Sequence, residues 1–397
     1  MIKSGSVLVI NCGSSSIKFS VVDHETSTHV IRGSVDRIGE ENAQLEYAAG
    51  QDKGSQSLGA VDHEKALQSI ASVLNKRARL QKELLAVGHR VVHGGERFST
   101  SSQIDDHVLS AIEGCNHLAP LHNPANVLGI RTAQRLFPGL PQVAVFDTAF
   151  HQTLPQRAYL YAIPYNLYKE HGIRRYGFHG TSHRFVTERA AALLKKPLGE
   201  CTFVSAHLGN GCSACAVLNG KSVETTMGLT PLEGLVMGTR SGDVDPGLHA
   251  HLQEQLGWDL DHITDVLNNE SGLLGLSGLS NDMRELIAAA AAGNENADLA
   301  IEVFCYRLAK AIGGLFVSLG RVGTVIFTGG IGENAPSIRA KVVQHLSLFG
   351  FDLDPERNAA HGARSNGWIT KDRDPIAMVV PTDEELMIAR ETITLLS

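Results

Sequence analysis

A strand–turn–strand pattern occurs twice in this chain, and its repetition is the feature that most restricts the fold. In the first copy an apolar run, Val7 to Ile10, leads to a polar residue, a turn of one glycine and three serines, and a second, alternating run. The stretch that begins at Thr202, TFVSAHLGNGCSACAVL, follows the same plan about half the chain later. Repetition on this scale predicts a duplicated domain in which each half contributes one glycine-rich hairpin.

The length and the order of the secondary-structure signals agree with two domains. A chain of 397 residues is too long for one compact core. Strand signals and helix signals alternate along it, which predicts an α/β fold. The segment Gln142–Thr148 is typical of a buried strand that ends in an acid. The apolar spacing predicts helices over five segments: 62–76, 105–114, 187–196, 284–292 and 297–320.

Composition and charge exclude several classes of protein. The chain is 43% hydrophobic and 19% charged, which is typical of a globular protein. Its net charge is −7 and it has no basic block, so we expect no nucleic-acid partner. No apolar run reaches the roughly 18 residues that span a membrane, and no signal-peptide pattern is present. We therefore expect a cytoplasmic protein with reduced cysteines and no membrane partner.

Three glycine-rich turns are candidates for phosphate binding. In the first, Gly13 permits a tight turn, the Ser14 and Ser16 hydroxyls can donate, and Lys18 adds a positive charge. HLGNG and TGGIGEN are the second and third turns, and the last of these opens a helix. Taken alone, each stretch is more often an ordinary solvent-facing turn. Three of them on one α/β chain favour a nucleotide site.

Charged side chains between small residues suggest a site for an anion. Arg90 in GHRVVHGGE and Arg240 in MGTRSGDVD each lie near glycines, and a planar guanidinium suits carboxylate and phosphoryl oxygens. A structural ion pair explains either arginine equally well. Asp147, His179 and His183 lie in turns with glycine and aromatic residues. A zinc site at the two histidines is disfavoured because no third ligand is near.

The segment PTDEE near the C-terminus has an explanation that needs no metal. Thr382 and Glu385 have the spacing of a capping box, which predicts a helix that begins with Thr382 as its N-cap. Asp383 and Glu384 would also favour the helix dipole. The spacing alone therefore does not assign a metal to Glu384.

Together these stretches resemble the acetate kinase family, and the resemblance runs the whole length of the chain. The motifs occur in family order, and Asp383 stands where many members carry asparagine. The stretches that carry the resemblance are NCGSSSIKF, GHRVVHGGE, PLHNP, VFDTAFHQT, RRYGFHGTSH, HLGNG, PLEGLVMGTRSGDVDP, FTGGIGEN and PTDEE.

The resemblance implies the fold and the assembly. It implies the actin-like ATPase and sugar kinase superfold, an α/β fold with two duplicated ribonuclease-H-like domains around a cleft. The first domain would hold residues 1–149 plus 385–397, where a C-terminal helix returns to it. The second, nucleotide-binding domain would hold residues 150–384. The family enzymes are homodimers, so a homodimer is expected here.

The resemblance also implies the reaction, in which ATP and acetate give ADP and acetyl phosphate with Mg²⁺, or with Mn²⁺ as the alternative ion. Asn11 and Glu384 would hold the metal. The implied catalytic residues are Arg90, Asp147, His179 and Arg240. The implied acyl pocket consists of Arg90, Val92, Leu121, Phe178 and Pro231. The implied ATP and ADP contacts are Ser14, Ser16, Lys18, His207, Leu208, Gly209, Asn210, Gly211, Asp282, Met283, Arg284, Gly330, Ile331, Gly332, Glu333 and Asn334.

Chemical arguments refine these implied roles. Acetate is ionised at neutral pH and needs no strong base, so Asp147 is better suited to orienting Arg90 or binding Mg²⁺ through water. Val92 is bulkier than the alanine associated with propionate-preferring relatives, which favours acetate. One methylene in an apolar pocket changes affinity by only roughly 1–3 kcal/mol, so propionate should be a slower substrate.

Three alternative functions are compatible with parts of this sequence. A propionate or short-chain fatty acid kinase of the same family is the nearest of them. An actin-like, nucleotide-driven binding module is disfavoured, because two glycine-flanked arginines suit a small anion. A sugar kinase would need an unpaired aspartate base beside neutral polar groups, and the arginines argue for a carboxylate instead.

Overall fold

The computed structural model describes residues 5–77, 82–120 and 122–397, and its chain forms two compact units. The first unit holds Met1–Phe150 and Asp383–Ser397, and the second holds His151–Thr382. Phe150, Asp383 and Glu384 thus belong to the first unit, whereas the expected boundaries placed them in the second. Asp383 belongs there because its carboxylate bonds to side chains of a strand of that unit.

Within its described residues, the first unit contains an eight-stranded sheet with the order β5-β4-β3-β2-β1-β6-β8-β7. The strands β1 to β5 form an antiparallel meander, and β6 and β8 continue it in parallel with β1. The strands are β1 (Ser6–Cys12), β2 (Ile17–Asp23), β3 (Thr28–Asp36), β4 (Ala43–Ala49), β5 (Asp52–Gly59), β6 (Leu84–Val91), β7 (Ser102–Gln103) and β8 (Gln142–Phe146).

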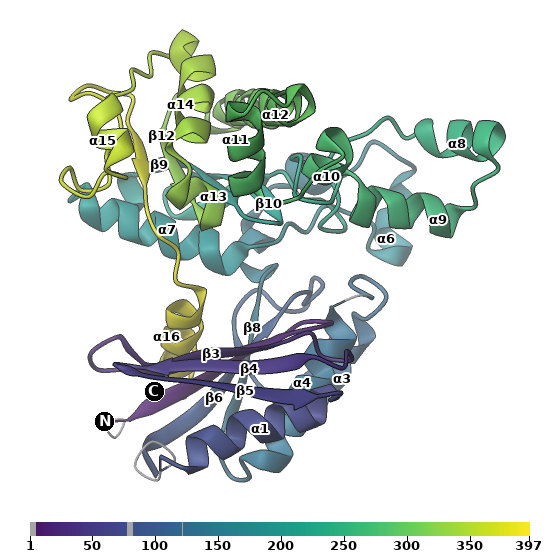
Figure 1. Cartoon of the computed structure of the whole chain (residues 1–397), viewed down its shortest axis with the longest axis vertical. Helices are drawn as coiled ribbons and strands as arrows, with labels where there is room; N and C mark the ends of the chain where they lie inside the picture. Colours follow the sequence, from purple (N-terminus) through teal and green to yellow (C-terminus); the bar gives the residue numbers. More distant parts are fainter. Residues whose placement is uncertain (1–4, 78–81, 121) are drawn as a thin grey trace. The chain divides into compact units, whose positions relative to one another are not determined.

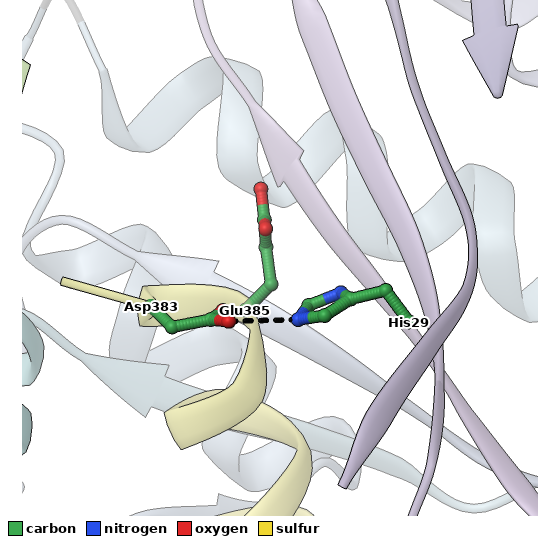
Figure 2. Close-up of side chains that lie close together, drawn as sticks. All are labelled: His29, Asp383 and Glu385. Carbon is green, nitrogen blue, oxygen red and sulfur yellow. Dashed lines mark hydrogen bonds and ion pairs between the residues drawn. The ribbon is translucent and has the colours of Figure 1, made fainter. Parts of the chain in front are cut away.

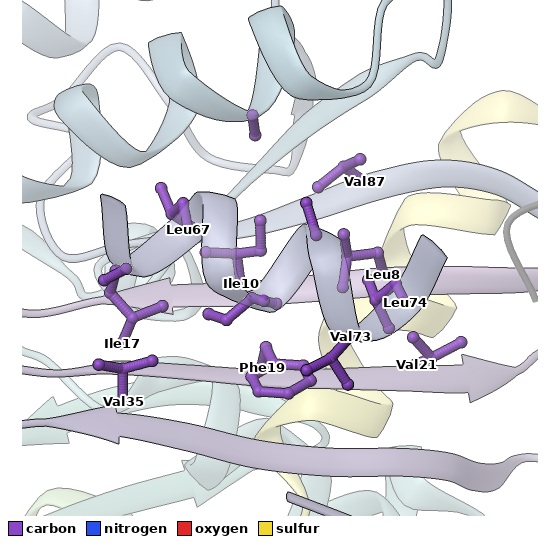
Figure 3. Packing of buried hydrophobic residues seen from close by; sticks show 14 of the residues in the cluster. Leu8, Ile10, Ile17, Phe19, Val21, Val35, Leu67, Val73, Leu74 and Val87 are labelled. Atoms are coloured by element: carbon purple, nitrogen blue, oxygen red, sulfur yellow. The ribbon is translucent and has the colours of Figure 1, made fainter. Parts of the chain in front are cut away.

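Helices cover both faces of this first sheet (Figure 1). The helices are α1 (His63–Asn75), α3 (Asp106–Gly114), α4 (Asn123–Leu136) and α16 (Glu384–Leu396). Alternate residues of β1 and β2, such as Leu8, Ile10, Ile17 and Phe19, pack against α1 in the main core, which Figure 3 shows. Because side chains alternate between the two faces of a strand, every second side chain of β1 and β2 is buried beneath α1.

The opposite face of the sheet receives α16, and a glycine allows this close packing. A Cβ atom on Gly88 of β6 would lie 2.6 Å from Thr392 Oγ1 and 2.8 Å from Ile388 Cγ2 of α16. Its neighbour Val87 points into the core on the α1 side. The helix can approach the strand only because no side chain stands between them.

The second unit repeats the same sheet plan. Its described strands have the order β11-β10-β9-β12-β13, with antiparallel pairing from β11 to β9 and parallel pairing from β9 to β13. The first unit contains the same arrangement as β3-β2-β1-β6-β8. The strands are β9 (Thr202–Leu208), β10 (Cys212–Leu218), β11 (Lys221–Thr225), β12 (Thr324–Thr328) and β13 (Ala377–Val379).

In Figure 1, α7 lies on one side of the second sheet and the long helix α12 lies on the other. α7 contacts β9 and β12, and α12 contacts β9, β10 and β11. The helical segments are η1 (Ala149–Thr153), α5 (Gln156–Tyr159), α6 (Tyr165–His171), α7 (Gly180–Leu193), η2 (Leu198–Glu200), α8 (Leu248–Leu256), α9 (Leu260–Asp265), η3 (Val266–Glu270), α10 (Gly272–Ser277), α11 (Met283–Ala291), α12 (Glu295–Leu319), α13 (Gly329–Asn334), α14 (Pro336–His345), η4 (Leu346–Phe349) and α15 (Pro355–Ala359).

The predicted duplication is confirmed by these two sheets, and the fold is a duplicated ribonuclease-H-like α/β fold. The predicted helices at 62–76, 105–114, 284–292 and 297–320 are confirmed as α1, α3, α11 and α12. In the segments that the structure describes, no helix combines the length and the apolar character needed to cross a membrane.

Candidate active site

In the first unit, Arg90 and Asp147 form a tight ion pair at the ends of two neighbouring strands. Arg90 Nε donates to both carboxylate oxygens of Asp147 at 3.1 Å, and Nη2 donates to Oδ2 at 2.5 Å. The side chain of Asp147 is 2% exposed and that of Arg90 is 20% exposed. Burial opposes the charge of Arg90, but Asp147 and then Glu384 outweigh it and hold the pKa of Arg90 above its ordinary value.

The third strand at this edge of the sheet supplies Asn11. Arg90 Nη1 donates to Asn11 Oδ1 at 3.3 Å. Glu384, in the first turn of α16, also raises the pKa of Arg90 through its charge. The structure therefore brings Asn11, a predicted metal ligand, and Asp147, a predicted catalytic residue, against Arg90, and the charge of Glu384 acts on the same guanidinium.

The turn between β1 and β2 is a tight hairpin, as its sequence predicts. Gly13 N donates to Ser16 O at 2.8 Å, which closes the turn. Ser14 and Lys18 are exposed, and Ser16 is half-buried. Lys18 is the register partner of Asn11, so both residues are presented on the same face of the sheet.

The start of α16 differs from the predicted capping box. The N-cap is Asp383, whose Oδ1 accepts from Leu386 N at 3.0 Å, and Thr382 does not cap the helix. The other carboxylate oxygen, Oδ2, lies 2.8 Å from His29 Nε2 and accepts from Arg32 Nη2 at 2.8 Å. Figure 2 shows the Asp383 carboxylate against the His29 ring, with Glu385 on the same helix. Three possible metal ligands, His29, Asp383 and Glu385, thus meet, but Arg32 already supplies the positive charge.

In the second unit, the HLGNG turn between β9 and β10 lies beside two predicted catalytic residues. A Cβ atom on Gly211 would lie 3.4 Å from Arg240 Nη1 and 3.5 Å from His179 Nε2. The ring of His179 stacks on that of His207 with 4.3 Å between the centroids. Arg240 Nη1 also donates to Pro231 O at 3.1 Å, which ties the arginine to the predicted acyl-pocket residue.

Two of the remaining predicted acyl-pocket residues, Val92 and Phe178, lie in the described part of the chain. Val92 and Phe178 are buried. Val92 N donates to Asn126 Oδ1 at 3.0 Å, and Phe178 O accepts from His151 Nε2 at 3.0 Å. Leu121 lies outside the described residues. Both described residues are therefore held by hydrogen bonds of their backbone.

A cavity of about 610 Å³ in the second unit gathers most of the predicted adenosine contacts. Asp282 caps α11 and pairs with Arg284, whose hydrogen bonds lower the pKa of Asp282 to about 2. Asn281, Ile287 and Ala335 also line the cavity and were not predicted. Asn281 directly precedes Asp282, and Ile287 follows Met283 by one helical turn, so their spacing could have indicated them. The cavity is lined by Gly209, Asn210, Asn281, Asp282, Met283, Arg284, Ile287, Gly330, Ile331, Asn334 and Ala335.

Two predicted nucleotide contacts have another role in the structure. Glu333 Oε1 accepts from Gly329 N at 3.0 Å and from Thr382 N at 3.1 Å, so this carboxylate caps α13 and holds the end of the second unit. Gly332 is buried and does not line the cavity. The first amide of α13 is thus bound by a carboxylate of the protein itself.

Arg339 supports the same turn and was not predicted. It is fully buried, and its Nη1 donates to Gly332 O and Glu333 O, both at 2.9 Å. Nε donates to Asn358 Oδ1 at 2.9 Å. Burial lowers the pKa of Arg339 to about 10. An arginine in the helix that follows a glycine-rich turn is the signal that could have found it.

The duplicated fold and the arginine–histidine site at a glycine-rich turn define a nucleotide-dependent phosphotransferase. The chain belongs to the acetokinase family, whose model matches residues 6–390. It is 53% identical over 393 residues to the acetate kinase of Shewanella oneidensis, with 98% of each chain covered.

Two solved structures are similar over nearly the whole chain. The propionate kinase of Francisella tularensis has a TM-score of 0.93 and 45% identity, with 98% of each chain covered. The acetate kinase of Porphyromonas gingivalis has a TM-score of 0.92 and 42% identity, with 99% of this chain and 100% of the other covered.

Proposed function

We propose that this chain transfers a phosphoryl group reversibly between ATP and acetate, with acetyl phosphate and ADP as products. The observation that carries the proposal is the approach of His179 Nε2 and Arg240 Nη1 to the same point over Gly211. A hydrogen-bond donor and a fixed positive charge at one glycine-rich turn suit a phosphoryl group in transfer. Membership of the acetokinase family supports the choice of acetate.

Asp147 acts in this proposal by positioning Arg90. Both of its carboxylate oxygens accept hydrogen bonds from Arg90, and the pair is largely buried. Acetate carries no proton at neutral pH, so the reaction requires no base at this position. Arg90 is then oriented to bind the acyl carboxylate, and phosphoryl transfer depends on alignment and charge neutralisation.

Asn11 and Glu384 are the proposed holders of Mg²⁺, with Mn²⁺ as the alternative ion. Their amide and carboxylate oxygens are the hard ligands that these ions prefer. The residues fit this role, because Asn11 Oδ1 and the charge of Glu384 both act on Arg90, whose own charge is offset by its ion pair with Asp147. The ion, when bound, would neutralise phosphate charge. Ser14, Ser16 and Lys18 would bind the phosphates.

The cavity around Asp282 and Gly330 is the proposed adenosine site. Its volume of about 610 Å³ falls in the range of small-molecule sites. Gly209 and Asn210 line it and belong to the turn that also holds Gly211, so the phosphates would extend from the cavity toward His179. Glu333 would act indirectly, by fixing the turn.

Val92, Phe178 and Pro231, with Leu121, are the proposed methyl pocket. Val92 supports acetate over propionate, as argued from its size. The similarity to the propionate kinase of Francisella tularensis favours a propionate kinase as the second candidate.

We propose a cytoplasmic homodimer as the working form. All six cysteines are free and buried, which suits a reducing compartment. Light scattering on the purified chain tests the assembly, and a monomeric mass at micromolar concentration would contradict it. No nucleic acid or membrane has a part in this proposal.

The first experiment incubates the protein with ATP, Mg²⁺ and acetate, propionate, butyrate or no acid, and traps acyl phosphate with hydroxylamine. We expect product with acetate well above propionate. More product with propionate or butyrate than with acetate would agree with the proposed mechanism but contradict the argument from the size of Val92. ATP turnover without product from any acid would contradict the kinase proposal and favour a binding module.

A further inference from the structure

In the second unit, His179 is joined by a series of hydrogen bonds to two buried serines and a buried histidine. Ser213 Oγ lies 2.9 Å from His179 Nδ1 and 2.8 Å from His183 Nε2. The other ring nitrogen of His183, Nδ1, lies 2.7 Å from Ser205 Oγ. Ser205, Ser213 and His183 are all completely buried, whereas His179 is half-buried at the Gly211 turn.

The number of protons on these four side chains fixes the direction of the hydrogen bonds between them. A hydroxyl donates once, and a neutral imidazole has one N–H donor and one acceptor nitrogen. Within the described part of the chain, His183 Nδ1 is the one acceptor within reach of Ser205 Oγ. A buried hydroxyl that donates to nothing is costly, so Ser205 donates to His183 Nδ1.

The remaining donors follow from that first step. His183 then carries its proton on Nε2 and donates to Ser213 Oγ. Ser213 has its own proton left, and it donates to His179 Nδ1. Because Nδ1 of His179 accepts, neutral His179 carries its proton on Nε2, the nitrogen that lies beside Gly211 and Arg240.

The environment of His183 keeps that ring neutral. Burial, reinforced by His151 and His207, holds the pKa of His183 well below its ordinary value. A charged His183 would donate from both nitrogens and would reverse the bond to Ser205. His183 must therefore be neutral for the hydrogen bonds from Ser205 to His179 all to run in one direction.

We propose that Ser205, His183 and Ser213 form a hydrogen-bond relay that holds His179 as the Nε2–H tautomer, ready to donate to the phosphoryl group. Ser213 and His183 are positioning residues, since they act through His179. The inference rests on the proposed function for the role of His179, whereas the tautomer itself is a property of the folded chain.

The decisive measurement is the tautomer of His179 in the full-length protein, by NMR of ¹⁵N-labelled imidazole rings. His179→Gln assigns the signal by its loss. We expect a protonated Nε2 and an unprotonated Nδ1 in the unsubstituted protein at neutral pH. A protonated Nδ1, in either the neutral or the charged ring, would overturn the proposal without any further variant.

Two serine variants then test the relay. In Ser213→Ala we expect both tautomers of His179 in exchange, kcat lowered about tenfold and KM for ATP changed less than about twofold. Ser205→Ala leaves Ser213 in place but removes the donor that sets the direction, so the His179 signals should move the same way. Unchanged His179 signals in either variant would overturn the relay.

Ser222→Ala is the matched control. Ser222 is equally buried and its hydroxyl lies 2.8 Å from His151 Nδ1, but it does not contact His179. We expect the His179 signals of the unsubstituted protein in this variant. The same shift in Ser222→Ala as in Ser213→Ala would indicate a general loss of packing and would contradict the relay. Absence of acyl phosphate in the unsubstituted protein would contradict the proposed function alone, since the tautomer is measured without turnover.

Discussion

Arg90 and Asp147 behave as one group at the scale of single residues. The carboxylate is 2% exposed and accepts three contacts from the guanidinium within 3.1 Å. Removing one member leaves the other charge buried, which commonly destabilises a protein by about 3–5 kcal/mol. A single substitution therefore mixes an effect on folding with an effect on chemistry.

Arg90→Ala is predicted to lower kcat/KM by about a hundredfold or more, because a charged donor to the transition state is lost. The hydroxylamine assay measures it. The double variant Arg90→Ala, Asp147→Asn is the control, because it also removes the buried carboxylate charge that Arg90 offsets. The double variant should unfold at a higher urea concentration than Arg90→Ala, and it should be as inactive as that single variant. A near-wild-type rate in either variant would remove Arg90 from the site.

Cys12 is predicted to be chemically inert in the folded protein. Burial raises the pKa of the Cys12 thiol to about 12, and the thiolate is the reactive form. Alkylation by iodoacetamide at neutral pH should be at least about a hundredfold slower than in urea, as measured by mass spectrometry of the Cys12 peptide. Equal rates in the two states would show that the thiol is accessible.

The start of α16 shows, at the scale of elements, what the sequence could and could not predict. The helix itself followed from its apolar period, but the cap was assigned to Thr382 by spacing alone. In the structure Asp383 takes the cap, because its carboxylate also reaches His29 and Arg32 of β3. Contacts between segments 351 or more residues apart are invisible to a local pattern.

The same limit explains α7. The sequence predicted a helix from Thr187, where the apolar residues recur, but α7 begins at Gly180. Its first turn carries buried polar residues, and Ser182 and His183 bond to His207 and Ser205 of β9. Polar residues satisfied by a neighbouring strand do not show the amphipathic period. The hairpins, by contrast, were predictable because both strands and the turn lie within one short segment.

Asp383→Ala is predicted to destabilise the first unit by about 1 kcal/mol through the lost cap. Asp383→Asn should cost less, because the asparagine oxygen can still accept from Leu386 N. Urea unfolding followed by circular dichroism compares the two. Equal losses in both variants would show that the charge pairing with His29 and Arg32, and not the cap, fixes the start of α16.

At the scale of the whole molecule, both units bury neutral histidines. Burial lowers the pKa of His89 and of His151 to about 4, and that of His93 to about 3. Burial also holds the pKa of His183 well below the ordinary value. Two of these side chains lie in each unit. Unfolding frees all four to titrate near their ordinary pKa of about 6.5.

Stability is therefore predicted to fall as the pH drops below about 6.5, because the unfolded chain then binds protons that the folded chain does not. Above that pH both states are neutral and these groups contribute no slope. Each histidine should lower the free energy of unfolding by about 2 kcal/mol by about pH 5, where the folded rings are still neutral. Scanning calorimetry from about pH 7 to about pH 5 should show a steep loss of Tm. His89→Gln, which can keep a donor to Gln142, should reduce the slope, whereas the exposed His251→Asn should not. A flat Tm over this range would contradict the burial of neutral histidines as the source of acid sensitivity.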